Sequence, residues 1–123
     1  MRGTVRPQES PTEEEVHMPK FLIQASYTSE GIKAVKAGGG TARREIVERA
    51  AKSVGGTIEA MYFAFGDHDV VVVADFPDNA SAAAMALTVG ANAPVRLRTT
   101  PLLTAEEVDK AAKIQVEYQP PKG

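Results

Sequence analysis

An aspartate, a histidine and a second aspartate stand together at Asp67, His68 and Asp69, at the junction of two apolar runs. An imidazole can transfer protons near neutral pH, and a neighbouring carboxylate can orient it. If these residues continued a strand, the two carboxylates would lie roughly 7 Å apart on one side, with His68 on the other. That distance is too long for two carboxylates to share a proton. Because Gly66 and Asp67 favour turns, we interpret the stretch first as a hairpin turn and second as a candidate site.

A metal site at these residues is not favoured. The only other histidine, His17, lies in the N-terminal segment, and the chain contains no cysteine. Disulfides, thiolate nucleophiles and thiolate metal ligands are therefore excluded. A single central histidine also cannot define a Ser-His-Asp or Cys-His arrangement with any specificity. We expect no metal and no cofactor.

Other residue types suggest ligand contacts. Tyr27 and Tyr62 combine an aromatic ring with a hydroxyl, which suits a cavity wall as well as ordinary packing. Arg96 and Arg98 fall on one face of a predicted strand, where they would bind an anion or protect a sheet edge from pairing. The glycine-rich segment 37–45 could cradle a phosphate, but it lacks the P-loop lysine and spacing, so a hinge is the simpler interpretation. The candidate ligand-binding residues are Tyr27, Tyr62, Asp67, His68, Asp69 and Arg96, with no catalytic residue assigned.

Length and charge limit the class of protein. The 123 residues suffice for one small domain, and the net charge of -2 gives no basic surface for nucleic acid. No apolar run approaches the roughly 20 residues that a membrane helix needs. The first 17 residues lack the apolar core of a secretory signal, so a cytoplasmic protein is expected. We predict a disordered extension at 1–17, a folded domain at 18–117 and a flexible tail at 118–123.

The elements that would position these residues alternate along the chain. Residues 20–27 are β-prone, and a helix broken at Gly38–Gly40 follows, capped by Thr28 or Ser29 and again by Thr41. Apolar residues then recur at helical spacing at Ile46, Val47, Ala50, Ala51 and Val54, with Arg43 and Arg44 expected to point elsewhere.

Strands and helices are predicted in the second half of the chain from the same kinds of signal. Gly55 and Gly56 end the helix, and strands at 57–66 and 69–76 are joined by a tight turn. Asp78 or Asn79 caps an alanine-rich helix that ends near Gly90, and a strand at 94–100 follows. The capping-box spacing of Thr104 and Glu107 predicts a last helix from 105 to about 117.

The order β-α-β-β-α-β is that of a ferredoxin-like α+β fold with an antiparallel sheet, here with an extra C-terminal helix. Its helices cover one face of the sheet. The run Val70–Val73 is apolar on both faces, so the other face should associate with a second copy. A dimer or a higher homo-oligomer is therefore expected. The alternative is that the C-terminal helix folds back over the bare face.

Three segments resemble the GYD-domain family: "MPKFLIQASYTSEGIKAV", "GGGTARREIVERAAKSVGGTIEAMYFAFGDHDVVVVADFPDNASAAA" and "RTTPLLTAEEVDKA". The resemblance covers about residues 18–113 and implies a dimeric α+β barrel. His68 departs from it, because it stands where a tyrosine is usual in the Gly-Tyr-Asp signature. The 66–76 hairpin with "VRLRTT" also resembles the effector domain of leucine-responsive transcription regulators, which bind amino acids at subunit interfaces. This chain shows no helix-turn-helix beside it.

Two functions follow as hypotheses. The first is a non-catalytic oligomeric barrel that binds a small molecule or serves assembly. The second is a cofactor-independent monooxygenase or isomerase acting on a small organic molecule. In the second, His68 would transfer a proton, and Tyr62 or Tyr27 would hold the substrate. The second hypothesis rests on fold analogy, and one fold hosts many functions.

Overall fold

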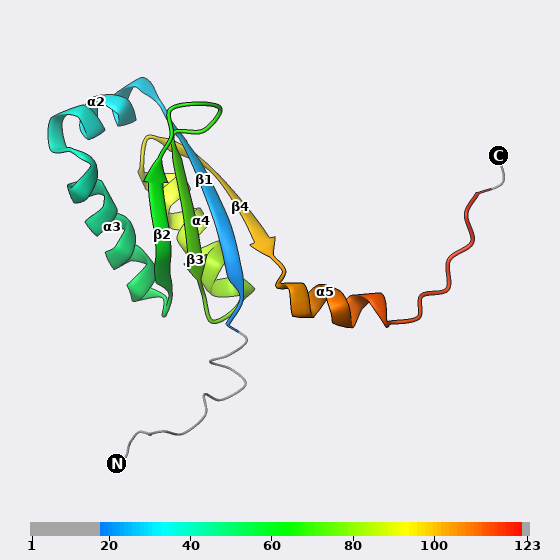
Figure 1. Cartoon of the computed structure of the whole chain (residues 1–123). Coiled ribbons are helices and arrows are strands. Elements are labelled where there is room, and N and C mark those ends of the chain that lie inside the picture. Colours follow the sequence, from blue (N-terminus) through cyan, green and yellow to red (C-terminus); the bar gives the residue numbers. More distant parts are fainter. Residues whose placement is uncertain (1–17, 122–123) are drawn as a thin grey trace, which may run out of the picture.

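The computed structural model describes residues 18–121, so the predicted extension at 1–17 lies outside the described residues. The elements follow in the order β1 (Lys20–Tyr27), α2 (Ser29–Gly38), α3 (Gly40–Ser53), β2 (Thr57–Phe63), β3 (Val70–Asp75), α4 (Asn79–Asn92), β4 (Val95–Leu102) and α5 (Ala105–Ala112). The ferredoxin-like order β-α-β-β-α-β is confirmed, as is the extra C-terminal helix (Figure 1).

The sheet is antiparallel throughout, with the strand order β2-β3-β1-β4. Central strand β1 pairs Leu22 with Val73 of β3 and with Thr100 of β4. The edge strand β2 carries a bulge between Ile58 and Ala60. The free edges of the sheet are therefore β2 and β4.

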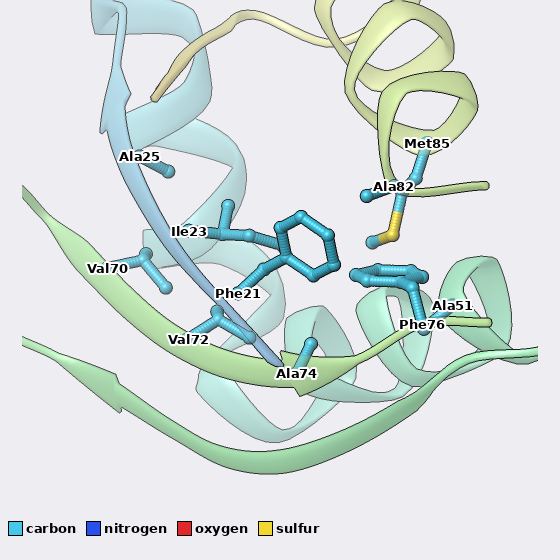
Figure 2. Packing of buried hydrophobic residues seen from close by; sticks show 10 residues of the cluster. All are labelled: Phe21, Ile23, Ala25, Ala51, Val70, Val72, Ala74, Phe76, Ala82 and Met85. Carbon is cyan, nitrogen blue, oxygen red and sulfur yellow. The ribbon is translucent and has the colours of Figure 1, made fainter. Parts of the chain in front are cut away.

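The core lies between the sheet and helices α3 and α4. Alternate residues of β1 and β3 point into it, because neighbouring side chains on a strand face opposite sides. Figure 2 shows the Phe21 and Phe76 rings beside each other near Ala82 and Met85 of α4. The two rings meet edge to face with centroids 5.6 Å apart.

The broken helix and most of the predicted caps are confirmed. Gly39, with φ at +86°, separates α2 from α3, and Gly55, with φ at +82°, follows α3. The hydroxyl of Thr28 accepts the Gly31 amide at the start of α2, and the Asp78 carboxylate accepts the Ser81 amide at the start of α4. The predicted cap at Thr41 is wrong, because Gly39 is the N-cap of α3 and provides no side-chain hydrogen bond.

The loop between β2 and β3 is longer than predicted. Strand β2 ends at Phe63 and β3 begins at Val70, so residues 64–69 form a protruding loop instead of a tight turn (Figure 1). Its left-handed residue is Phe65, with φ at +56°, and not a glycine. Asp67 and His68 therefore do not continue a strand, and the strand-based spacing predicted for their carboxylates does not apply.

One face of the sheet is left without a helix among the described residues (Figure 1). We call it the open face; its side chains are Lys20, Leu22, Gln24, Ser26, Thr57, Ala60, Tyr62, Val71, Val73, Asp75, Arg96, Arg98, Thr100 and Leu102. Leu22, Val71 and Val73 form an apolar cluster on its two central strands, next to Gln24, and charged residues lie at its rim. Helix α5 projects beyond the end of β4 and does not fold back over this face. It ends at Ala112, five residues earlier than predicted.

Candidate functional site

A cavity of about 260 Å³ lies between helices α3 and α4 and the helix-covered face of the sheet. Apolar side chains form most of its wall: Ile23, Ala25, Met61, Val70, Val72 and Leu97 from the sheet, and Ile46, Val47, Ala50, Ala82, Met85, Ala86 and Val89 from the helices. The volume exceeds that of an engineered protein cavity of about 150 Å³ that binds benzene.

Small side chains on both helices account for this space. Ala50 of α3 and Ala82 and Ala86 of α4 face the sheet where larger residues would normally fill a core. Protein interiors are otherwise packed as densely as organic crystals, so three alanines opposite a sheet leave room for a guest. The alanines of both helices, together with the separation of α3 and α4 over the sheet, leave the cavity open.

Polar groups gather at one end of the cavity, where β1 ends and β4 begins. Tyr27 pairs with Val95 across these strands, and the Thr28 amide donates to the Pro94 carbonyl at 3.0 Å. The guanidinium carbon of Arg43 lies 5.9 Å from the centroid of the Tyr27 ring, within the range of a cation–π contact. Asn92 also lines this end, and its side-chain amide donates to the Thr88 carbonyl at 2.8 Å.

Burial raises the pKa of the Tyr27 phenol above its ordinary value. The positive charge of Arg43 opposes this shift, and the negative charge of Asp69 adds to it. A tyrosine is already neutral at pH 7, and a raised pKa keeps its proton in place well above that pH. The Tyr27 hydroxyl therefore stays protonated and can act as a hydrogen-bond donor.

The loop residues predicted as ligands lie beside the end of β1 but not in the cavity. The Asp69 carboxylate accepts the backbone amide of Tyr27 at 2.8 Å, so it anchors the loop to the strand. His68 is half-buried, and its Nδ1 lies 3.5 Å from the Ser26 hydroxyl. Asp67 is exposed in the loop.

The remaining predicted site residues are dispersed. Tyr62 is 71 % exposed on the open face, and Arg96 is exposed on the same face of β4. Of the six candidates, Tyr27 alone lines the cavity. The structure thus does not bring the six residues together in one site.

Arg43 is the principal cavity residue that the sequence interpretation missed. It was expected to point away from the apolar face of its helix, yet it lines the cavity with Val47 and Ala50. The spacing of these three residues, i, i+4 and i+7, places them on one helical face. That spacing was visible in the sequence, but the charge of Arg43 suggested solvent exposure.

Metal binding and membrane insertion are two further possibilities for residues 18–121. No three histidine, aspartate or glutamate side chains within that range come close enough to hold a metal ion. Nor does any described helix combine the length and apolar character required to cross a bilayer.

The fold and the cavity define a ferredoxin-like α+β domain with an internal space between helices and sheet. A transcriptional regulator has the same fold, with a TM-score of 0.53 and 18 % identity, over 85 % of this chain and 64 % of the other. The leucine response regulatory protein of Mycobacterium tuberculosis is 14 % identical, with a TM-score of 0.47, over 82 % of this chain and 62 % of the other. This chain thus spans less than two thirds of either regulator.

The family model of the GYD domain matches residues 21–112. The chain therefore belongs to the GYD domain family, and the predicted family is confirmed. A protein of unknown function from Nitrosomonas europaea is similar at 23 % identity, over 72 % of this chain and 94 % of the other, with a TM-score of 0.40. Among curated proteins, none matches the sequence.

Proposed function

We propose that this GYD domain is a homo-oligomeric module that binds a small, largely apolar molecule between its helices and its sheet. The observation that supports this function best is the cavity of about 260 Å³ with an apolar wall and a polar end. Binding pockets of this character, apolar with a few polar groups, are the usual sites for small organic ligands.

The cost of leaving such a space empty favours an occupant. At about 24 cal/mol per Å³, an unfilled and dry cavity of this size would destabilise the fold by about 6 kcal/mol. This is an upper bound, because Ile46 in the cavity wall is 49 % exposed and water can enter beside it. Even half of this cost is a large share of the roughly 5–15 kcal/mol that typically stabilises a domain.

Filling the cavity should block the ligand and stabilise the fold. In the variant Ala86→Leu, we expect toluene to bind at least tenfold more weakly than to the unchanged protein, because the new side chain occupies the apolar part of the cavity. The free energy of unfolding should rise by about 0.5–2 kcal/mol, as for other cavity-filling changes. Titration calorimetry and thermal unfolding measure the two effects.

The matched control is Ala84→Leu, which makes the same change on the exposed side of α4. It should leave toluene binding unchanged. If Ala86→Leu bound toluene as tightly as the unchanged protein, the cavity would not be the binding site.

The open face supports the oligomeric part of the proposal. Leu22, Val71 and Val73 lie at its centre, and Tyr62 beside them is 71 % exposed. At one end, the Lys20 amine donates to Glu59 at 2.6 Å and to Asp75 at 2.8 Å, and these hydrogen bonds raise the pKa of Lys20. An apolar centre with a charged rim is the usual composition of a protein interface.

The C-terminal arm, residues 103–121, adds apolar surface that the described residues leave uncovered. Its exposed side chains are Leu103 at 70 %, Val108 at 51 %, Ile114 at 64 %, Val116 at 75 % and Tyr118 at 73 %. Large contiguous apolar surfaces are uncommon on proteins that remain monomeric. Contact between copies would cover both the arm and the open face.

The enzymatic alternative gains no support from the described contacts. His68 does not line the cavity. In the enzymatic hypothesis Asp69 or Asp67 of a neighbouring chain would orient His68; within this chain, the Asp69 carboxylate accepts the Tyr27 amide.

A further inference from the structure

The polar end of the cavity indicates the chemical class of the ligand, an inference that rests on the proposed function above. We infer that the ligand is a compact monocarboxylate, with its carboxylate bound by Arg43 and Tyr27 and its apolar body buried between α3, α4 and the sheet. Three features of the cavity support this: a cation without a carboxylate partner among residues 18–121, a matching number of donors, and a lining from that range with no second charged side chain.

The cation is Arg43. It is half-buried, whereas its neighbours Arg44 and Glu45 are exposed. Arg44 approaches Glu48 at 4.0 Å, but within residues 18–121 no carboxylate pairs with Arg43. A guanidinium drawn partly out of water without a counter-ion loses solvation that an anionic ligand would replace.

The amino end of helix α3 adds a positive electrostatic potential to the charge of Arg43. Arg43 lies in the first turn of α3, which has no acidic residue and no side-chain cap. The amino end of a helix of this length carries partial positive charge and favours an anion. An acidic residue in the first turn would have neutralised that field.

The number of donors matches a carboxylate better than a phosphate. A guanidinium offers paired N–H donors with the spacing of two carboxylate oxygens, and the Tyr27 hydroxyl adds one more donor. One of the two N–H donors of the Asn92 side chain is engaged with the Thr88 carbonyl. A phosphate would bring a third oxygen and a second charge, and within residues 18–121 the cavity wall provides no second cation.

The rest of the cavity wall limits the size and polarity of the part of the ligand that lies beyond its carboxylate. Within residues 18–121, Arg43 is the one charged side chain that lines the cavity, and Met61, Val72 and Met85 contribute to its apolar wall. Scaling from a cavity of about 150 Å³ that holds benzene gives room for about ten non-hydrogen atoms. An aryl-substituted or branched short-chain acid has this size and character.

The test compares 3-phenylpropanoate with 3-phenylpropan-1-ol, which share the same body but differ in charge. Titration calorimetry on the full chain at pH 7 should show the carboxylate bound roughly tenfold to hundredfold more tightly than the alcohol, the range for a charge-assisted hydrogen bond. Arg43→Gln should remove that preference and leave the affinity for the alcohol within about twofold. Arg43→Lys, which keeps the charge but not the paired donors, should retain part of it.

Arg44→Gln is the matched control, since it removes the same charge from the adjacent exposed position, and it should leave the preference intact. If the unchanged protein bound both compounds equally, the ligand class would be wrong and the binding function would stand. If neither compound bound, the proposed function would fail as well. If Arg43→Gln and Arg44→Gln lowered the preference equally, a general effect of net charge would replace the role of Arg43.

Discussion

Replacing Phe76 by alanine is expected to lower the free energy of unfolding by about 3–5 kcal/mol, the usual cost of removing a buried phenylalanine ring. Phe76 is completely buried, and its ring packs edge to face against Phe21. The Phe76 ring also packs so closely against Gly56 that a Cβ added at Gly56 would lie 2.6 Å from it. The core has few large side chains, so the neighbouring alanines cannot fill the space. Denaturant unfolding followed by circular dichroism measures the loss.

Phe65→Ala serves as its control. Phe65 is 60 % exposed in the 64–69 loop, and its ring stacks on Phe63 with centroids 6.1 Å apart, so its truncation should lower the free energy of unfolding by no more than about 1.5 kcal/mol. Equal losses for the two variants would contradict the core described here, in which Phe76 is the largest fully buried side chain.

Introducing a charge at the centre of the open face should separate the copies. In a two-fold interface Val73→Asp places a carboxylate on both sides, because each residue occurs twice. Each unpaired polar group costs at least about 2 kcal/mol to bury, so about 4 kcal/mol is lost. That corresponds to a roughly thousandfold weaker association, at about 1.4 kcal/mol per factor of ten. Sedimentation velocity should show the oligomer replaced by single chains.

Thr100→Asp, on the same face but on the edge strand, is the comparison for this variant. It should weaken association far less, because a rim charge stays in water. A folded Val73→Asp variant that sedimented like the unchanged protein would place the interface elsewhere. If the unchanged protein itself sedimented as a single chain, the oligomeric proposal would be abandoned.

Local sequence signals predicted most of the fold. The Thr104–Glu107 capping box, the Asp78 cap and the glycine at position 55 each depend on residues next to one another in the chain. The order of the predicted elements indicated the ferredoxin-like topology, and the family resemblance implied the same class of fold. These features could be predicted because their causes lie within a few residues.

The errors arose where longer-range contacts decide the structure. The 64–69 loop was predicted as a tight turn around Gly66 and Asp67. Instead, the Asp69 amide donates to the Ala25 carbonyl and the Asp69 carboxylate accepts the Tyr27 amide, and these two hydrogen bonds hold the loop on β1. Helix α5 was predicted to reach 117. It ends at Ala112, and the next apolar residues, Ile114, Val116 and Tyr118, alternate with polar ones in an extended segment.

The cavity could not be predicted from the sequence. Alanines at positions 50, 82 and 86 fit any helix that packs closely, and only the separation of α3 and α4 over the sheet leaves them facing a space. Tyr27 was named as a candidate for its amphipathic ring alone. Arg43 could have been recognised from its spacing to Val47, had its charge not suggested exposure.

The central claim is that a small molecule occupies the space between the helices and the sheet, and methionine methyl groups test it directly. The chain has four methionines; Met61 and Met85 line the cavity, and Met18 lies before β1. Carbon-13 methyl spectra should therefore show the Met61 and Met85 signals shift as 3-phenylpropanoate is added, with Met18 unchanged. Signals that all remained in place, or a shift of Met18 alone, would contradict a ligand in this cavity.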